Sequence, residues 1–204
     1  MYSSKTLKQT PSQTVGPYFH IGCLPNVIGI NSSVPEKLND LVLLKKNKSS
    51  LINICGKIYD GAHEPIKDAL VEIWQINSIE NFNSRIGKNN IEDPCLSNWG
   101  RTCCHFKTGL WSFNTIKPSM IQLNYNEILA PHIWLWIAAR GINIGLYTCI
   151  FFSDETKFNK KDYNLRKIQN HKNLNSLFAR KINVNKYQFD IFLQGDKETI
   201  FFDI

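Results

Sequence analysis

Six short apolar segments, each about the length of a β-strand, most constrain what this chain can fold into. Turn signals separate them, notably DGAHEP at 60–65 and KPS at 117–119, where glycine and proline interrupt regular structure. Several short strands punctuated in this way are typical of two packed sheets. The sequence therefore predicts an all-β, single-domain β-sandwich. Its expected strands are LINICGKIYDG (51–61), ALVEIWQI (69–76), LWSFNTIKP (110–118), HIWLWIAAR (132–140), LYTCIFFSD (146–154) and YQFDIFLQG (187–195).

Two segments depart from the strand pattern. Residues 1–30 are expected to form an extended N-terminal arm, because TPSQTVGPYF at 10–19 carries two prolines and a glycine and disfavours a helix. Residues 154–182 are polar, and NLNSLFARKI at 173–182 is compatible with a short helix that packs Leu174, Leu177 and Phe178 inward. We therefore expect an arm over 1–30, a sandwich domain over 31–204, and a short helical insertion near 154–182.

The composition is that of a globular protein, with 43% hydrophobic and 20% charged residues among 204. No apolar run reaches the roughly 18 residues needed to cross a bilayer, and the N-terminal sequence shows no secretory signal. We therefore expect a cytoplasmic protein with no membrane association. The lysine clusters behind the net charge of +7 lack the interleaved aromatic residues of a nucleic-acid groove, so no nucleic-acid partner is predicted. A basic chain is also compatible with an anionic substrate or an acidic partner subunit.

The stretch LAPHIWLWIAARGIN at 129–143 places a histidine before an apolar run and an arginine after it. A strand that carries a metal usually offers two ligands as His-x-His, since alternate side chains point the same way, but Trp134 holds the second position. If 132–140 is one strand, His132 and Arg140 share a face yet lie about 26 Å apart, at roughly 3.3 Å per residue. They cannot serve one site. By residue type alone, His132 is expected to be packed and Arg140 to lie at the surface.

Five ordered motifs resemble those of the intradiol ring-cleaving dioxygenases, and more narrowly the alpha chains of the two-chain members. They are TPSQTVGPYFH near the N-terminus, ICGKIYDGAHEPIKDALVEIWQIN, FNTIKPS, APHIWLWIAARGIN, and the closing QGDKETIFFDI. The resemblance runs from about residue 10 to the C-terminus and is least distinctive over 24–50 and 155–175. It implies O₂-dependent cleavage of 3,4-dihydroxybenzoate between its hydroxyl-bearing carbons, giving 3-carboxy-cis,cis-muconate.

Catalytic chains of this family hold a ferric ion with two tyrosines and two histidines, and most of that set is missing here. His132 matches the first histidine, whereas Trp134 replaces the second. Neither KPSMIQLN (117–124) nor NSIENFNSRIGKNNIEDP (77–94) contains a tyrosine at the places the family uses. Tyr125 is close in sequence, but two candidate ligands do not complete a ferric site. The resemblance therefore implies no metal ligand and no catalytic residue in this chain, and an Fe(3+) held by a homologous beta chain.

The resemblance also implies a set of substrate-binding residues at the interface with that beta chain. The matching positions are Arg140, Thr14, Gly16 and Pro17, with Tyr18 a weaker match. Glycine and proline suit this role, because backbone without Cβ approaches a ligand closely and proline adds little ordering entropy. The alternative for the whole chain is a non-catalytic β-sandwich binding module that retains the dioxygenase fold and works alone, with its basic surface facing an anionic partner. The alternative for the arm is a loose terminus.

Overall fold

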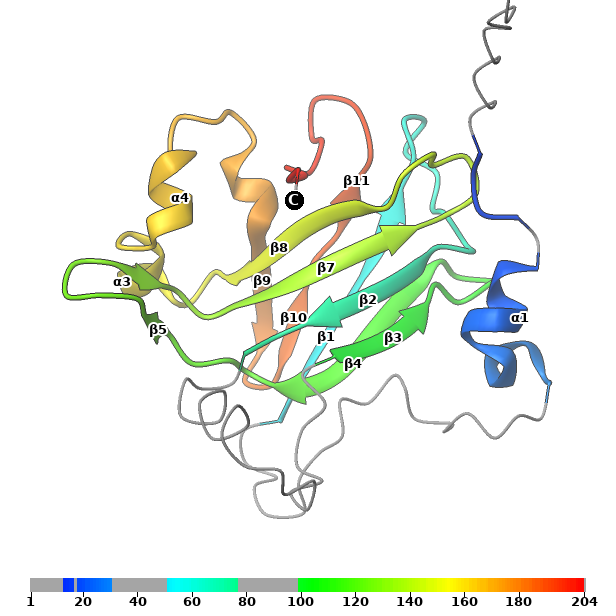
Figure 1. Ribbon diagram of the computed structural model, residues 1–204, viewed down its shortest axis with the longest axis horizontal. Coiled ribbons are helices and arrows are strands. Elements are labelled where there is room, and N and C mark those ends of the chain that lie inside the picture. Colours follow the sequence, from blue (N-terminus) through cyan, green and yellow to red (C-terminus); the bar gives the residue numbers. More distant parts are fainter. Residues whose placement is uncertain (1–12, 17, 31–50, 77–98, 204) are drawn as a thin grey trace, which may run out of the picture.

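The computed structural model describes residues 13–16, 18–30, 51–76 and 99–203, and within these residues the chain is built mainly of strands (Figure 1). The strands are β1 (Leu51–Tyr59), β2 (Leu70–Trp74), β3 (Trp99–Cys103), β4 (Leu110–Ile116), β5 (Ile121–Gln122), β6 (Ile128–Leu129), β7 (His132–Ala138), β8 (Leu146–Phe152), β9 (Phe178–Asn183), β10 (Lys186–Gln188) and β11 (Ile191–Phe192). The predicted all-β class is confirmed. The division into an arm over 1–30 and a domain over 31–204 stays a prediction.

One large sheet wraps into two facing halves. Its strand order is β11-β1-β10-β9-β8-β7-β2-β3, and β4 pairs antiparallel with β1 along its length. Most neighbours are antiparallel, whereas β10 and β11 run parallel to β1, and β9 runs parallel to β8. In Figure 1, β7 and β2 cross in front of β1 and β10, while β3 and β4 come side by side. The sheet is therefore nearly closed, and its inner surface can bury a core.

Side chains alternate between this core and the outside, as the period of a strand requires. Ile133, Leu135 and Ile137 of β7 are buried within the main core cluster, whereas His132, Trp134 and Trp136 are half-buried on the other face. The other members of the cluster come from both halves of the sheet, including Ile54, Ile58, Val71, Ile73, Trp111, Phe113, Ile150, Phe152, Tyr187 and Ile191. The two halves are thus held together by one continuous apolar interior.

The strand expected at 187–195 is divided into β10 and β11, although both pair parallel with β1 in the same register, Asn53 with Lys186 and Ile58 with Ile191. The backbone carbonyl of Phe189 passes so close to Gly56 that a Cβ there would lie 1.8 Å from its oxygen. Between β10 and β11, the side chain of Asp190 replaces a backbone hydrogen bond, since its Oδ1 accepts a hydrogen bond of 3.0 Å from the Lys57 amide. Glycine in the middle of a strand here marks a close approach of two backbones.

The N-terminal segment is only partly extended. Residues 13–16 have no regular structure, as expected, but two short helices that the sequence did not predict follow: α1 (Phe19–Cys23) and η1 (Pro25–Ile28). They form because Phe19 and Leu24 gain apolar contacts with Leu70 and Cys103, where β2 begins and β3 ends. Pro25 occupies the first turn of η1, the one helical position that tolerates proline.

The predicted helical insertion is present but ends earlier than expected. It comprises α3 (Thr156–Asn159), α4 (Tyr163–Lys167) and the 3₁₀-helix η3 (Leu174–Leu177), after which residues 178–183 form β9. Asp162 is fully buried and joins the insertion to the sheet, because its carboxylate accepts hydrogen bonds from the amides of Leu165 and Ala130. None of the helices among the described residues is long and apolar enough to cross a membrane.

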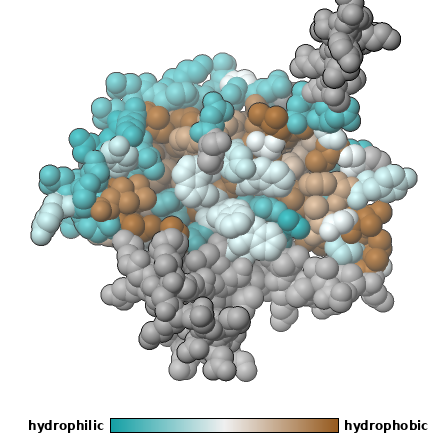
Figure 2. Space-filling view, viewed as in Figure 1, coloured by the Kyte–Doolittle hydropathy of each residue, from teal (hydrophilic) through white to brown (hydrophobic). Residues whose placement is uncertain are grey.

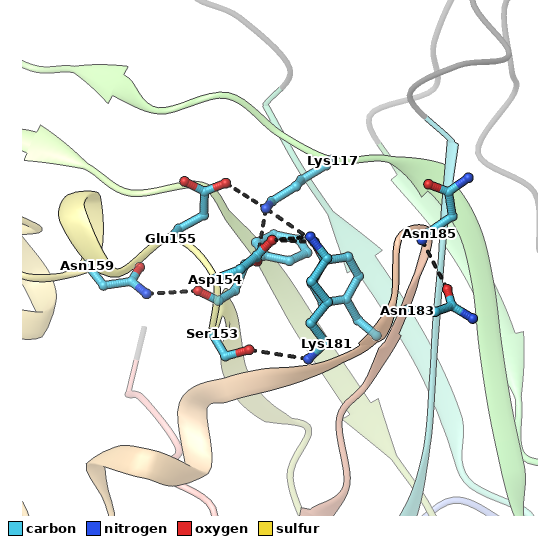
Figure 3. A network of polar contacts seen from close by, with 10 residues as sticks. Lys117, Ser153, Asp154, Glu155, Asn159, Lys181, Asn183 and Asn185 are labelled. Carbon is cyan, nitrogen blue, oxygen red and sulfur yellow. Dashed lines mark hydrogen bonds and ion pairs between the residues drawn. The ribbon is translucent and has the colours of Figure 1, made fainter.

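A network of charges joins four elements at one end of the sandwich (Figure 3). Lys117, in the turn after β4, lies 3.1 Å from Asp154 and 2.6 Å from Glu155, which follow β8. Lys181 of β9 lies 2.7 Å from Asp154, and the hydroxyl of Tyr187 on β10 donates to the same carboxylate at 3.0 Å. Asp154 is therefore the centre that holds the ends of β4, β8, β9 and β10 together.

This network makes a prediction about acid stability. Burial alone would raise the pKa of Asp154, but hydrogen bonds from Lys181, Lys117 and Tyr187 outweigh it and lower the pKa to about 2. A carboxylate whose pKa is depressed by folding adds stability that is present above its unfolded pKa and is lost as pH falls through the folded value. We expect part of the stability to disappear between about pH 4 and pH 2. Asp154→Asn should flatten that dependence in denaturant titrations across this range, whereas the exposed Asp196→Asn should not. An unchanged slope for Asp154→Asn would contradict this assignment.

Candidate functional site

The two predicted positions lie at opposite ends of strand β7. His132 begins the strand, and Arg140 lies just beyond its end. The strand ends at Ala138, and Arg140 sits in the turn that Gly141 completes with a positive φ of 86°. The expected strand over 132–140 therefore ends two residues early, and the condition under which His132 and Arg140 would share one strand face is not met. That the two residues lie in different places still holds.

At the first end, His132 and Trp134 are packed among aromatic side chains. The Nδ1 of His132 donates to the Ala130 carbonyl at 2.7 Å, and its ring lies 5.8 Å from that of Phe151. The Trp134 indole meets Phe202 edge-on at 5.4 Å. An indole supplies no lone pair to a metal, so these residues do not fit the ferric ion of the family.

Other donors among the described residues do not complete a metal site either. Tyr125 is fully exposed on the turn between β5 and β6. No group of three or more His, Cys, Asp or Glu side chains within the described ranges could hold a metal ion. The described cysteines are all free thiols, and burial raises the pKa of Cys103 to about 11 and that of Cys104 to about 12. Such thiols remain protonated and behave as small apolar side chains.

At the second end, the arm and the turn after β7 meet. The Gly141 amide donates to Thr14 Oγ1 at 3.1 Å, across 127 positions of the chain. Arg140 forms an ion pair through its Nε with Asp68, which precedes β2. The Arg140 side chain is 62% exposed, and its two terminal nitrogens have no partner among the described residues. The guanidinium is thus held on one edge and open on the other.

These residues border a cavity of about 220 Å³. Its lining consists of Val15, Gly16, Phe19, His20, Ile28, Asp68, Phe106 and Arg140. Three predicted positions, Thr14, Gly16 and Arg140, therefore come together. Tyr18 does not line the cavity and is 77% exposed, while Pro17 lies outside the described residues.

Among the described residues, nothing requires a glycine at position 16. A Cβ built there meets nothing within 4 Å, and its φ is not positive. The predicted close approach of this backbone to a ligand therefore stays a prediction.

Two residues of this cavity were missed by sequence reasoning. His20 is buried, and its Nε2 donates to the backbone carbonyl of Asp68 at 2.9 Å. Asp68 contacts both His20 and Arg140. Both lie inside the quoted motifs, but no spacing or periodicity signals a contact between residues 72 positions apart.

Beside this cavity, the outer face of β2, β3 and β7 is rich in aromatic side chains. Trp74 pairs across the strands with Trp99 and Trp134, and Trp136 pairs with Tyr147. Trp74 is 52% exposed. Figure 2 looks onto this side of the molecule, where bulky apolar and weakly polar side chains gather across the middle.

A second cavity, of about 290 Å³, opens on this aromatic face. Trp74, Trp136, Tyr147 and Phe19 line it together with a partly buried ion pair, in which Arg101 lies 2.5 Å from Glu72. Phe19 also lines the cavity beside Arg140. The aromatic face and the Arg140 cavity are thus neighbouring parts of one surface.

A third cavity, of about 380 Å³, lies between η3, β9, β10 and β11. It is lined by side chains of both charges, among them Lys172, Arg180, Asp190 and Asp196, and contains none of the predicted site residues. Its larger volume does not outweigh the convergence of predicted residues at Arg140.

Comparison with known proteins identifies the family. The profile of the Dioxygenase_C family, described as Dioxygenase, matches residues 35–195. The chain is 34% identical over 200 residues to the protocatechuate 3,4-dioxygenase alpha chain of Pseudomonas putida, covering 97% of each chain. It is 28% identical over 205 residues to the corresponding alpha chain of Burkholderia cepacia, covering 98% of this chain and 99% of that one.

Solved structures agree at the level of the fold. An intradiol ring-cleavage dioxygenase from Tetranychus urticae matches with a TM-score of 0.52 and 17% identity, over 74% of this chain and 83% of the other. The 3-chlorocatechol 1,2-dioxygenase of Rhodococcus opacus matches with a TM-score of 0.53 and 15% identity, over 75% of this chain and 62% of the other. The chain belongs to the intradiol ring-cleaving dioxygenase family, and it resembles the alpha chains of protocatechuate 3,4-dioxygenase along nearly its whole length.

Proposed function

We propose that this chain is the iron-free alpha subunit of a protocatechuate 3,4-dioxygenase and works in a pair with a homologous beta chain. The pair would cleave 3,4-dihydroxybenzoate with O₂ between the two hydroxyl-bearing carbons and release 3-carboxy-cis,cis-muconate. Full-length relatives that carry this name support the assignment. The Fe(3+) belongs to the beta chain in this proposal, because Trp134 offers no lone pair to a metal and the matching sequence positions lack the family's tyrosines.

The observation that carries the proposal is that Gly16 and Arg140 line one cavity, while Thr14 accepts a hydrogen bond from Gly141, the residue next to Arg140. Nothing in the core of this chain requires that arrangement, since Arg140 is mostly exposed and the Cβ position of Gly16 is open. A wall that a partner completes needs such residues at its surface. In the pair, this chain would supply that wall and the beta chain would supply the metal.

Arg140 is suited to an aromatic acid. Its Nε is occupied by Asp68, so the two terminal nitrogens remain to donate parallel hydrogen bonds to a carboxylate. 3,4-Dihydroxybenzoate carries such a carboxylate, whereas catechol does not. The cavity therefore favours the carboxylated member of this substrate class.

Arg140→Ala tests this role in the assembled pair. We expect kcat/KM for 3,4-dihydroxybenzoate to fall by a transition-state cost of roughly 2–3 kcal/mol, and less if water enters the site. The loss should be smaller for catechol, because no carboxylate contact is removed. Steady-state kinetics with both substrates, alongside iron content and thermal stability, measure this.

Arg166→Ala is the matched control, because Arg166 is an exposed arginine on α4 outside the cavity. Its kinetics should equal those of the unmodified pair. Equal losses for the two substrates in Arg140→Ala, or no loss at all, would remove Arg140 from the substrate pocket.

The aromatic face supplies a surface for the beta chain. Monomeric proteins rarely expose contiguous large apolar patches, and tryptophan and tyrosine are enriched where partners bind. The neighbouring cavity, bordered by the same Phe19, is the place where the shared pocket would form. Partner binding to this face would therefore bring the beta chain up to Arg140.

Trp74→Lys should weaken pairing by about 1–2 kcal/mol, roughly a tenfold loss of affinity or more. Val184→Lys is the control, since Val184 is 81% exposed in the turn between β9 and β10, outside this face. Sedimentation or titration calorimetry with the beta chain compares the two. Equal affinities would move the interface elsewhere.

A further inference from the structure

Asp68 links the arm to Arg140 through two different groups. Its backbone carbonyl accepts the hydrogen bond from His20 of α1 at 2.9 Å, and its carboxylate pairs with the Nε of Arg140. The Asp68 side chain is 22% exposed, whereas that of Arg140 is 62% exposed. The Asp68 carboxylate is therefore the more buried group of the pair, and the Arg140 side chain is the one that faces the solvent.

The chosen nitrogen determines where the guanidinium points. The group is planar, with its five N–H donors in a rigid fork. When Nε–H is held by Asp68, the plane can no longer turn freely, and the outer edge of the group, formed by one N–H of each terminal nitrogen, remains open. Without that bond, the long side chain would sample several rotamers and would have to be ordered by the substrate.

His20 fixes Asp68 in turn. The His20 ring is buried, and it lies 5.6 Å from Phe106 in an edge-on contact and 5.9 Å from Phe19. A carbonyl only accepts, so Nε2 carries the proton, and Nδ1 has no hydrogen-bond partner in the described part of the chain. Within that part, the ring is held by packing and by the hydrogen bond to Asp68. The hydrogen bond from the Gly141 amide to Thr14 is a second contact between the arm and the turn that carries Arg140.

We propose that Asp68 is a positioning residue that sets the orientation of Arg140 for the substrate carboxylate, with His20 holding Asp68 in place. This inference rests on the proposed function of Arg140. It assigns the arm a role within its own chain: α1 supports the turn that orients the arginine. Asp68 lines the same cavity, and in this proposal it acts through Arg140.

The test is Asp68→Asn in the assembled pair, which removes the charge and keeps the shape. We expect KM for 3,4-dihydroxybenzoate to rise roughly three- to tenfold while kcat changes less than about twofold, because a half-exposed ion pair has a modest worth. Iron content should not change. Asp68→Glu, which keeps the charge, should recover most of the loss. Asp196→Asn, the same change at an exposed position in another cavity, should leave KM unaltered.

A double variant separates this idea from the proposed function. If Asp68 acts through Arg140, then Asp68→Asn combined with Arg140→Ala should be no worse than Arg140→Ala alone. Additive losses, or an unchanged KM in Asp68→Asn while Arg140→Ala is impaired, would overturn the inference and leave the proposed function standing. No effect of Arg140→Ala would remove both.

A second readout does not depend on catalysis. If Asp68→Asn fails to pair with the beta chain, hydrogen exchange of the Arg140 Nε–H in this chain decides the question. The exchange should be several-fold faster in Asp68→Asn than in the unmodified chain. Equal exchange rates would show that Asp68 does not hold the guanidinium.

Discussion

Replacing Gly56 with alanine is expected to lower the free energy of unfolding by at least about 3 kcal/mol, a cost near the upper end for a single methyl group. The new Cβ would lie 1.8 Å from the Phe189 carbonyl oxygen and 2.6 Å from its carbon. Both atoms are backbone, so no side-chain rotation relieves the overlap. The segment between β10 and β11 would have to move away from Gly56, and the hydrogen bonds that pair these strands with β1 would be disturbed.

Gly22→Ala is the matched control. Gly22 lies within α1, and a Cβ there meets nothing within 4 Å. Alanine in a helix is favoured over glycine by up to about 1 kcal/mol, so this variant should be as stable as the unmodified chain or slightly more stable. Chemical denaturation of both variants provides the comparison. A Gly56→Ala chain whose free energy of unfolding falls by less than about 1 kcal/mol would mean that the backbone at Phe189 moves away from residue 56 easily.

The main strands could be predicted from the sequence because they are short apolar segments bounded by turn signals. The segments at β1, β4, β7 and β8 lie where this pattern places them. Strand β3, with the sequence WGRTC, has a glycine and an arginine at its centre and shows no apolar pattern. Strand β9, with FARKIN, is half polar and mostly exposed, and its pairing with β8 and β10 overrides the helical pattern.

The helices of the arm depend on contacts that no local pattern records. Phe19 and Leu24 are stabilised by Leu70 and Cys103, which come from distant segments. The break between β10 and β11 has the same kind of origin, because it depends on where Gly56 lies in another strand. Tertiary packing, and not local propensity, decides both features.

The candidate site was only partly accessible from sequence. Resemblance to the family selected Thr14, Gly16 and Arg140, and the fold brings these three together. Residue types alone favoured a surface role for Arg140, which its exposure supports. Asp68 and His20 could not be found in this way, because an ion pair and a side chain to backbone bond leave no periodic signal.

The largest functional effect that we expect concerns the binding of iron. This chain alone is expected to bind no stoichiometric iron and to cleave no 3,4-dihydroxybenzoate, because an indole, which offers no lone pair to a metal, stands at residue 134. Trp134→His should not create a site, since the family's two tyrosine ligands are absent from the matching sequence positions. Metal analysis and O₂ uptake of the purified variant check this, and stoichiometric iron in Trp134→His would contradict it.

The most direct measurement compares iron content and O₂-dependent ring cleavage for this chain alone, the beta chain alone, and the reconstituted pair. We expect the pair to carry one ferric ion for each beta chain and to convert 3,4-dihydroxybenzoate to 3-carboxy-cis,cis-muconate. We expect this chain alone to do neither. Stoichiometric ferric iron and ring cleavage by this chain alone would contradict the account. So would a beta chain whose activity is the same with and without this chain, a result that a binding module working alone would give.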